Sequence, residues 1–315
     1  MSLRSHIMLS LKKPLSHICH LYPHKTPAEF EADVVYLKSR YHLPTWNEFV
    51  HNRNTPHQSG RQTALLTFDD GLSQCFDYVR PILLKHQVPS IFFITKNCMD
   101  NQHMLYRHKA SLCIARVTAA APNEQARLLS KVGQAFGIGE FSANGFATWI
   151  NGLEIVNEDS IDQVCELLEV NIQDVLVRQK PYLTTEQIQQ LAVDGFTIGG
   201  HSVRHGRLQL FGAAEVEREI VESCEFIQQL VGTRDVPFAF PFTGKNLDRE
   251  FLNSVMQRHS FIQGLFDTAG LATDAPFIIH RIGADEPAEV PPGRSGLKWL
   301  IRSSYVNQLC RQHSQ

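Results

Sequence analysis

Residues 64–71 read Ala64-Leu65-Leu66-Thr67-Phe68-Asp69-Asp70-Gly71, which is a short apolar run, two adjacent carboxylates and a glycine. The run predicts a buried strand that delivers both aspartates to its C-terminal end, where the glycine lets the chain turn. Two neighbouring buried carboxylates are costly unless a positive group lies beside them. The stretch therefore predicts a buried strand that ends at a cation site.

Ligands for such a cation follow a later apolar run. Phe196-Thr197-Ile198 leads into Gly199-Gly200-His201-Ser202-Val203-Arg204-His205. Two histidines four positions apart after a strand can turn both imidazoles toward one point. One Asp and two His make an open catalytic metal site with room for water. Either half alone has a simpler interpretation, a capped turn for the aspartates and surface or core positions for the histidines.

Strand and helix signals alternate along most of the chain. Ser90-Ile91-Phe92-Phe93-Ile94-Thr95 is a second buried strand, and with residues 64–68 and a helix over 72–87 it makes a parallel βαβ unit. Further helices are expected over 26–37, 184–194 and 213–231, and further strands over 196–200, 237–242 and 276–282. The alternation predicts an α/β fold, a closed or nearly closed parallel barrel.

Residues 99–180 interrupt this alternation. Helical spacing over Met104–Ala121, Glu124–Phe136 and Ser160–Val177 predicts an insertion, which either lines a substrate groove or only packs on the barrel. We expect residues 1–60 to form the strand and helix prelude of the barrel, 61–98 its first βαβ unit, 99–180 the helical insertion, 181–286 the rest of the barrel and 287–315 a helical tail. The tail either docks on its own domain or touches a membrane surface.

The composition is that of an ordinary globular protein, with 43% hydrophobic and 20% charged residues. A net charge of −2 over 315 residues gives no indication of a nucleic-acid partner. The seven cysteines are scattered, odd in number and never in a Cys-x-x-Cys pair, which indicates free thiols in a reducing compartment. No signal-peptide core and no transmembrane-length apolar run is found, so a cytoplasmic location is expected.

Thr67–Gly71 and His201-Ser202-x-x-His205, in this order and each after a strand, resemble the first two signature motifs of the polysaccharide deacetylases, the NodB-homology domain or carbohydrate esterase family 4. The resemblance implies a distorted (β/α)7 barrel with a helical insertion and with its motifs at the C-terminal strand ends. It implies Asp69 as catalytic base. It also implies Asp70, His201 and His205 as ligands of a divalent metal, most often Zn²⁺ and in some members Co²⁺, Ni²⁺ or Mn²⁺.

The later motifs of the family are matched less closely. Phe240-Pro241-Phe242-Thr243-Gly244 stands where Arg-x-Pro-Tyr-Gly is expected, without the arginine. Pro241 and Phe242 are the candidate oxyanion and substrate residues, with the Phe242 backbone N–H as donor. The same pattern also fits an apolar strand that ends in a turn.

The final expected strand, Pro276–Ile282, carries two further candidates. His280 is a candidate proton donor to the leaving amine, and water is the alternative. Arg281 is the candidate to orient Asp69 in place of the missing arginine. The fourth motif of the family is not recognisable. Asp267 lies about where it is expected and either supports the site residues or is an ordinary loop residue, and we interpret it as the latter.

Together these features predict a metal-dependent hydrolase that removes N-acetyl groups from an amino sugar, carried on a polymer, a lipid or a nucleotide. Two alternatives stay open at this point. One is a C–N hydrolase of a non-sugar amide on the same barrel. The other is a carbohydrate-binding module that has lost catalysis, which the departures in the third and fourth motifs favour and the retained Asp69 opposes.

Overall fold

The computed structural model describes residues 7–11, 26–52, 61–272, 274–284 and 296–312; for residues 7–11 and 307–312 it describes only the backbone. In the expected prelude over residues 1–60, the described strand is β1, Ile7–Leu11, whereas residues 12–25 and 53–60 lie outside the described part of the chain.

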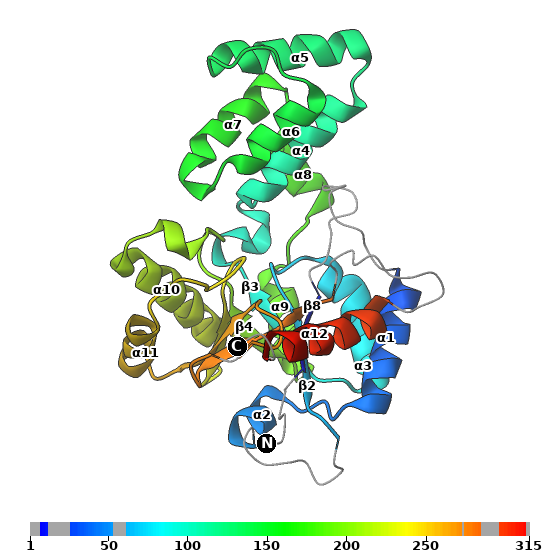
Figure 1. Ribbon diagram of the computed structural model, residues 1–315, viewed down its shortest axis with the longest axis vertical. Coiled ribbons are helices and arrows are strands. Elements are labelled where there is room, and N and C mark those ends of the chain that lie inside the picture. The colour runs from blue at the N-terminus through cyan, green and yellow to red at the C-terminus, as the bar shows by residue number, and fades with distance from the viewer. Residues whose placement is uncertain (1–6, 12–25, 53–60, 273, 285–295, 313–315) are drawn as a thin grey trace.

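A curled sheet of parallel strands forms the body of the protein (Figure 1). The strands are β1, β2 Ala64–Phe68, β3 Ser90–Ile94, β4 Thr197–Gly200, β5 Val236–Ala239, β6 Ile262–Asp267, β7 Ile278–His280 and β8 Ile282–Gly283. They are ordered β7-β6-β5-β4-β3-β2-β1-β8, and every pairing is parallel. The expected α/β class and deacetylase-type barrel are confirmed.

A single segment of chain joins the two edges of this sheet. β7 pairs with β6, and β8 pairs with β1, yet only Arg281 separates β7 from β8. The curled sheet therefore closes on itself at residues 278–283. Arg281 lies at this seam, where the last strand passes from one edge of the sheet to the other.

Helices surround the sheet, and one of them, α2, places Trp46 and Phe49 in its interior. They are α1 Pro27–Arg40, α2 Trp46–Asn52, α3 Arg80–His86, α9 Thr185–Val193, α10 Ala213–Val231, α11 Arg249–Arg258 and α12 Gly296–Gln312. Thr26 begins α1 with a capping box to Glu29, and α10 spans the residues 213–231 that were expected to be helical. The helix expected over 72–87 is a π-helical segment, Cys75–Val79, continued by α3. In α12, Leu297 and Ile301 are buried in the main core, so the tail helix docks on its own domain.

Five helices between β3 and β4 form a separate layer beyond one end of the sheet (Figure 1). They are α4 Tyr106–Ala119, α5 Pro122–Ala135, α6 Ala143–Gly152, α7 Glu158–Leu167 and α8 Ile172–Gln179. They enclose a hydrophobic cluster of their own. The helix expected over 160–177 is in fact two, because the chain breaks near Glu169, which has φ +59°. α6 was not expected.

The interior of the sheet is filled by a small apolar cluster. Its members are Trp46, Phe49, Leu65, Ile91, Phe93, Ala239, Phe266 and Ile279. Because side chains alternate across a strand, Leu65 on the inner face predicts that Thr67 and Asp69 also point inward. The same rule places Arg281 inward with Ile279 and turns His280 the other way. No helix in the described part of the chain is long and apolar enough to cross a membrane.

Candidate active site

Asp69 and Asp70 follow β2 directly, and the chain turns sharply behind them. Asp70 has φ +71° and Gly71 has φ +70°, so two successive residues adopt the left-handed conformation. A non-glycine residue in this region is strained and persists only where its surroundings enforce it. The turn lets two adjacent carboxylates, which would otherwise point to opposite faces, serve the same site.

His201 and His205 are delivered by a strand with close neighbours on both sides. A Cβ atom on Gly199 would lie 2.5 Å from the ring of Phe93, and one on Gly200 would lie 2.9 Å from the sulfur of Cys224 on α10. Only glycine lets β4 fit between the interior cluster and this helix. The two glycines therefore allow β4 to pack closely on both sides, which fixes the position of the histidine loop, residues 201–205, that follows it.

Asp70, His201 and His205 meet at one point. Their nearest side-chain ligand atoms all lie within 4.8 Å of one another. Asp70 Oδ1 is 2.9 Å from His205 Nε2 and 3.3 Å from His201 Nε2. His201 Nδ1 lies 2.8 Å from the carbonyl oxygen of Ala239, and a proton on Nδ1 leaves Nε2 as the free ligand atom. Two imidazole nitrogens and one carboxylate suit a divalent transition metal such as Zn²⁺.

A buried glutamate holds the histidine loop in place. Glu219 on α10 is 0% exposed and accepts the backbone N–H groups of Val203 and Arg204 at 2.8 and 3.1 Å. Within the same loop Ser202 and His205 have φ values of +65° and +60°. The loop is strained, and Glu219 supplies the hydrogen bonds that fix it.

Electrostatics favours the charged form of Asp70. Burial alone would raise the pKa of this carboxyl, but the adjacent rings of His205 and His201 hold it well below its usual value. Asp70 is therefore ionised at neutral pH.

Asp69 is paired with Arg281 inside the barrel. The guanidinium donates from Nη1 to Oδ1 at 2.6 Å and from Nη2 to Oδ2 at 2.9 Å, and Nη1 also donates to the hydroxyl of Thr67 at 3.1 Å. Arg281 is 0% and Asp69 is 2% exposed. Burial raises the pKa of Asp69, but Arg281 outweighs this and lowers the pKa overall. The structure brings Arg281 to the residue that it was expected to orient.

Phe242 borders the cluster of Asp70, His201 and His205. Its ring centroid is 5.1 Å from that of His205, and its φ is +59°. The Thr268 hydroxyl donates to its carbonyl oxygen at 2.7 Å. Among the described residues, the backbone N–H of Phe242 makes no hydrogen bond, so it can still donate to a ligand. Pro241, which precedes it, is buried.

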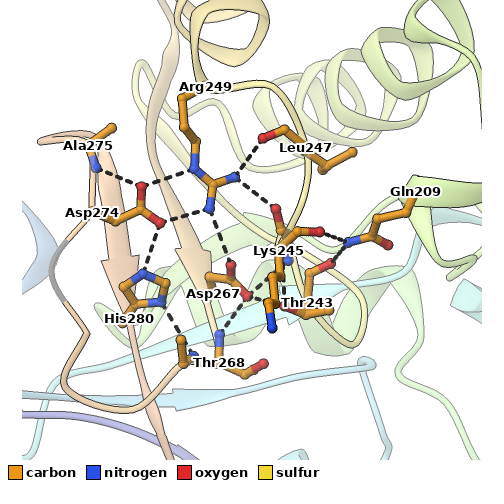
Figure 2. A network of polar contacts seen from close by, with 12 residues as sticks. Gln209, Thr243, Lys245, Leu247, Arg249, Asp267, Thr268, Asp274, Ala275 and His280 are labelled. Atoms are coloured by element: carbon orange, nitrogen blue, oxygen red, sulfur yellow. Dashed lines mark hydrogen bonds and ion pairs between the residues drawn. The ribbon is translucent and has the colours of Figure 1, made fainter. Parts of the chain in front are cut away.

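Asp267 anchors the loop that carries Phe242 (Figure 2). Its Oδ1 accepts hydrogen bonds from the Thr243 hydroxyl and the Gly244 N–H, both at 2.9 Å, and from the Thr268 N–H at 2.7 Å. It is 1% exposed and ends β6. The interpretation of Asp267 as an ordinary loop residue is therefore wrong.

His280 belongs to the same polar network as Asp267, to which Asp274 and Arg249 join it (Figure 2). Its Nε2 is 3.1 Å from Asp274 Oδ2, and its Nδ1 accepts the N–H of Ala269 at 3.3 Å. The alternation of strand side chains explains this position, because Arg281 points inward and its neighbour must point outward. The structure does not bring His280 to Asp70, His201 and His205, and we do not retain it as the proton donor.

Sequence reasoning missed Glu219, although a signal was present. The residue lies on the apolar stripe of α10, between Val216 and Ile220, where a carboxylate is costly unless it is hydrogen-bonded. A charged residue at such a position indicates a specific buried partner.

Comparisons with known proteins agree with the fold. Residues 57–139 and 146–257 match the polysaccharide deacetylase family. No curated protein matches the chain. Three solved structures share the fold, with 94% of this chain and 96–99% of each of those chains covered. The deacetylase PplD of Streptococcus pyogenes in complex with acetate has 12% sequence identity, covers 94% of this chain and 96% of its own, and has a TM-score of 0.56. IcaB from Ammonifex degensii has 15% identity, 94% and 97% coverage and a TM-score of 0.52, and a de-N-acetylase from Aggregatibacter actinomycetemcomitans has 11% identity, 94% and 99% coverage and a TM-score of 0.51.

The family match covers more than half of the chain, and it includes both the aspartate pair and the histidine loop. The chain therefore belongs to the polysaccharide deacetylase family, whose members are hydrolases acting on carbon–nitrogen bonds other than peptide bonds.

Proposed function

We propose that this protein is a metal-dependent N-deacetylase of an acetamido sugar. The observation that carries the proposal is the convergence of Asp70, His201 and His205 beside Asp69, which is itself paired with the buried Arg281. A pure binding module has no need for an ionised carboxylate held this way.

The metal would be held by Asp70, His201 and His205, and when bound it supplies a Lewis acid that lowers the pKa of water and polarises the acetyl oxygen. Zn²⁺ suits this donor set best, and Co²⁺, Ni²⁺ and Mn²⁺ remain candidates for the same ligands.

In this proposal Asp69 acts as the general base. Its lowered pKa keeps it ionised at neutral pH, so it can take the proton of the attacking water. Both of its oxygens accept from Arg281, which fixes the carboxylate plane while leaving lone pairs that point elsewhere. Arg281 is a positioning residue in this scheme.

The backbone N–H of Phe242 supplies a hydrogen-bond donor for the acetyl oxygen in this scheme. This N–H is unpaired among the described residues and is carried by a loop that Asp267 holds rigid. Such an N–H is suited to stabilise the negative charge on the acetyl oxygen of the tetrahedral intermediate.

The test is acetate release by Zn²⁺-reconstituted protein from N-acetylhexosamine oligomers, lipid-linked N-acetylhexosamine, nucleotide-linked N-acetylhexosamine and simple non-sugar acetamides. We expect release from at least one sugar substrate and its loss in Asp69→Asn, with metal content unchanged. The matched control is Asp77→Asn, which alters an exposed carboxylate on the segment after β2. Release only from non-sugar amides would contradict the sugar assignment, and no release from metal-loaded protein would contradict deacetylation.

A further inference from the structure

A group of charged and aromatic residues joins the helical insertion to the loop that carries His205. We call Arg107, Glu154, Arg207 and Phe242 the arginine platform. The guanidinium carbon of Arg207 lies 4.4 Å from the centre of the Phe242 ring, and that of Arg107 lies 5.7 Å from it. Phe242 is also the ring that contacts His205. The platform is therefore one aromatic ring away from a predicted metal ligand.

The backbone fixes Arg207 at this place. A Cβ atom on Gly206 would lie 2.7 Å from the Ile155 side chain and 2.8 Å from the Phe211 ring, so only glycine allows such a close approach. Ile155 belongs to the insertion, whereas Gly206 directly follows His205. The contact joins the insertion to the histidine loop and leaves little freedom to the residue that comes next.

The platform carries more positive than negative charge. Arg107 Nη2 and Arg207 Nε both donate to the same oxygen of Glu154, each at 2.9 Å. The other oxygen of Glu154 accepts the hydroxyl of Tyr106 at 2.7 Å. Two guanidinium groups thus share one carboxylate, and one positive charge stays uncompensated within the platform.

The guanidinium of Arg207 is only partly hydrogen-bonded within the described residues. Its Nε is bonded to Glu154, but its two Nη atoms make no hydrogen bond with any residue that the structure describes. Its side chain is 38% exposed, compared with 20% for Arg107. The cation–π contact with the Phe242 ring and the bond to Glu154 restrain the guanidinium, so its two Nη groups form a fork that is available to a ligand.

An acetamide is neutral and has no need of this charge. A planar guanidinium fork suits the paired oxygens of a phosphate group, and its bonds to an anion are stronger than bonds between neutral groups. We propose that Arg207, supported by Arg107, binds a phosphate group of the substrate, so that the substrate is an acetamido sugar bearing a phosphate or diphosphate ester. This inference rests on the proposed function and narrows its substrate class to lipid-linked or nucleotide-linked sugars.

The experiment compares kcat/KM for acetate release from four substrates. They are a neutral N-acetylhexosamine oligomer, N-acetylhexosamine 1-phosphate, a nucleotide-diphosphate N-acetylhexosamine and a lipid-diphosphate N-acetylhexosamine. We expect at least one phosphorylated substrate to be preferred over the neutral oligomer. Arg207→Met should lower that preference by about 10- to 100-fold. The preferred substrate shows whether the phosphate group belongs to a simple sugar phosphate, a nucleotide or a lipid diphosphate.

Two further variants separate recognition from folding. Arg207→Lys keeps the charge but loses the fork, and it should retain only part of the preference. Arg258→Met removes a half-exposed arginine at the far end of α11 and should leave the preference unchanged. A preference for phosphate that rising salt weakens would further support a charge contact.

The outcomes also separate this inference from the proposed function. Turnover of the neutral oligomer without any preference for phosphorylated substrates would overturn the role of Arg207 and leave deacetylation intact. A preference that survives both Arg207 variants would overturn it as well. Absence of acetate from every substrate would instead overturn the proposed function.

Discussion

The ion pair between Asp69 and Arg281 gives the sharpest prediction. Arg281→Met replaces the guanidinium with an apolar side chain and leaves a carboxylate that is 2% exposed without its cation. Removal of one partner from a buried ion pair costs about 3–5 kcal/mol, and the lost bond to Thr67 adds about 1 kcal/mol. This is a large share of the 5–15 kcal/mol that is typical for the unfolding free energy of a protein.

Urea denaturation of a double-mutant cycle measures this effect. Asp69→Asn and Arg281→Met should each destabilise the protein, while the double variant should recover much of the loss, since no charge is then buried alone. We expect a coupling energy of about 3 kcal/mol. Arg80→Met is the control: Arg80 also bonds both oxygens of Asp194, but these side chains are 23% and 11% exposed. Its loss should cost about 1 kcal/mol.

The same variant tests the positioning role. Arg281→Met should lower kcat about 100-fold at a temperature where it stays folded, because Asp69 loses the bonds that fix its orientation. Metal content should not change, since the bonds of Arg281 go to Asp69 and Thr67 and not to the Asp70, His201 and His205 cluster. Two results would refute the reasoning: a destabilisation no larger than that of Arg80→Met, or additive effects in the cycle.

Three further predictions follow from single contacts. Glu219→Gln should weaken metal binding about 10- to 100-fold in a chelator competition, whereas Glu222→Gln, at a half-exposed site on the same helix, should not. Asp267→Ala should lower the unfolding free energy by about 3 kcal/mol because three donors lose their acceptor, and Asp267→Asn by less. Burial lowers the pKa of His108 to about 4 from 6.5, so stability should be full above pH 6.5 and fall by up to about 3 kcal/mol as the pH drops to about 4. His108→Gln should flatten this slope in urea denaturation, and an unchanged slope would contradict the assignment.

Elements with a continuous apolar face could be predicted from the sequence. All five residues of β2 and of β3 are buried, as in parallel strands that are covered on both faces. The stripe on α10 and the glycine after it, with φ +66°, set both the face and the end of that helix. These signals are local, so neighbours in the chain suffice to read them.

β6 shows what local signals cannot supply. Its first half contains Gln263 and Gly264, a weak strand pattern. Gly264 has φ +87°, and a Cβ atom there would lie 3.0 Å from the ring of Trp46. The reason for this glycine is thus a side chain more than two hundred residues earlier, and the strand is stabilised by pairing with β5 and β7.

The site residues likewise divide into those that local sequence patterns predict and those that depend on distant parts of the chain. Asp70, His201 and His205 lie together as their spacing predicts, while their roles stay predictions until metal and turnover are measured. For the last strand, side-chain alternation alone would have shown that His280 and Arg281 cannot both point into the barrel. The arginine platform joins Arg107 to Phe242 across more than a hundred residues, and no local pattern indicates that contact.

The position of Arg281 shows how a guanidinium reaches Asp69 although the third motif of this chain carries no arginine. A guanidinium can reach Asp69 only from an inward-facing position near the C-terminal ends of the strands. The last strand offers such a position because it closes the sheet, pairing with β6 before Arg281 and with β1 after it. β1 is in turn the neighbour of β2, which carries the aspartates. Closure of the barrel therefore brings residue 281 beside residue 69, and the arginine can come from either motif provided that the seam is formed.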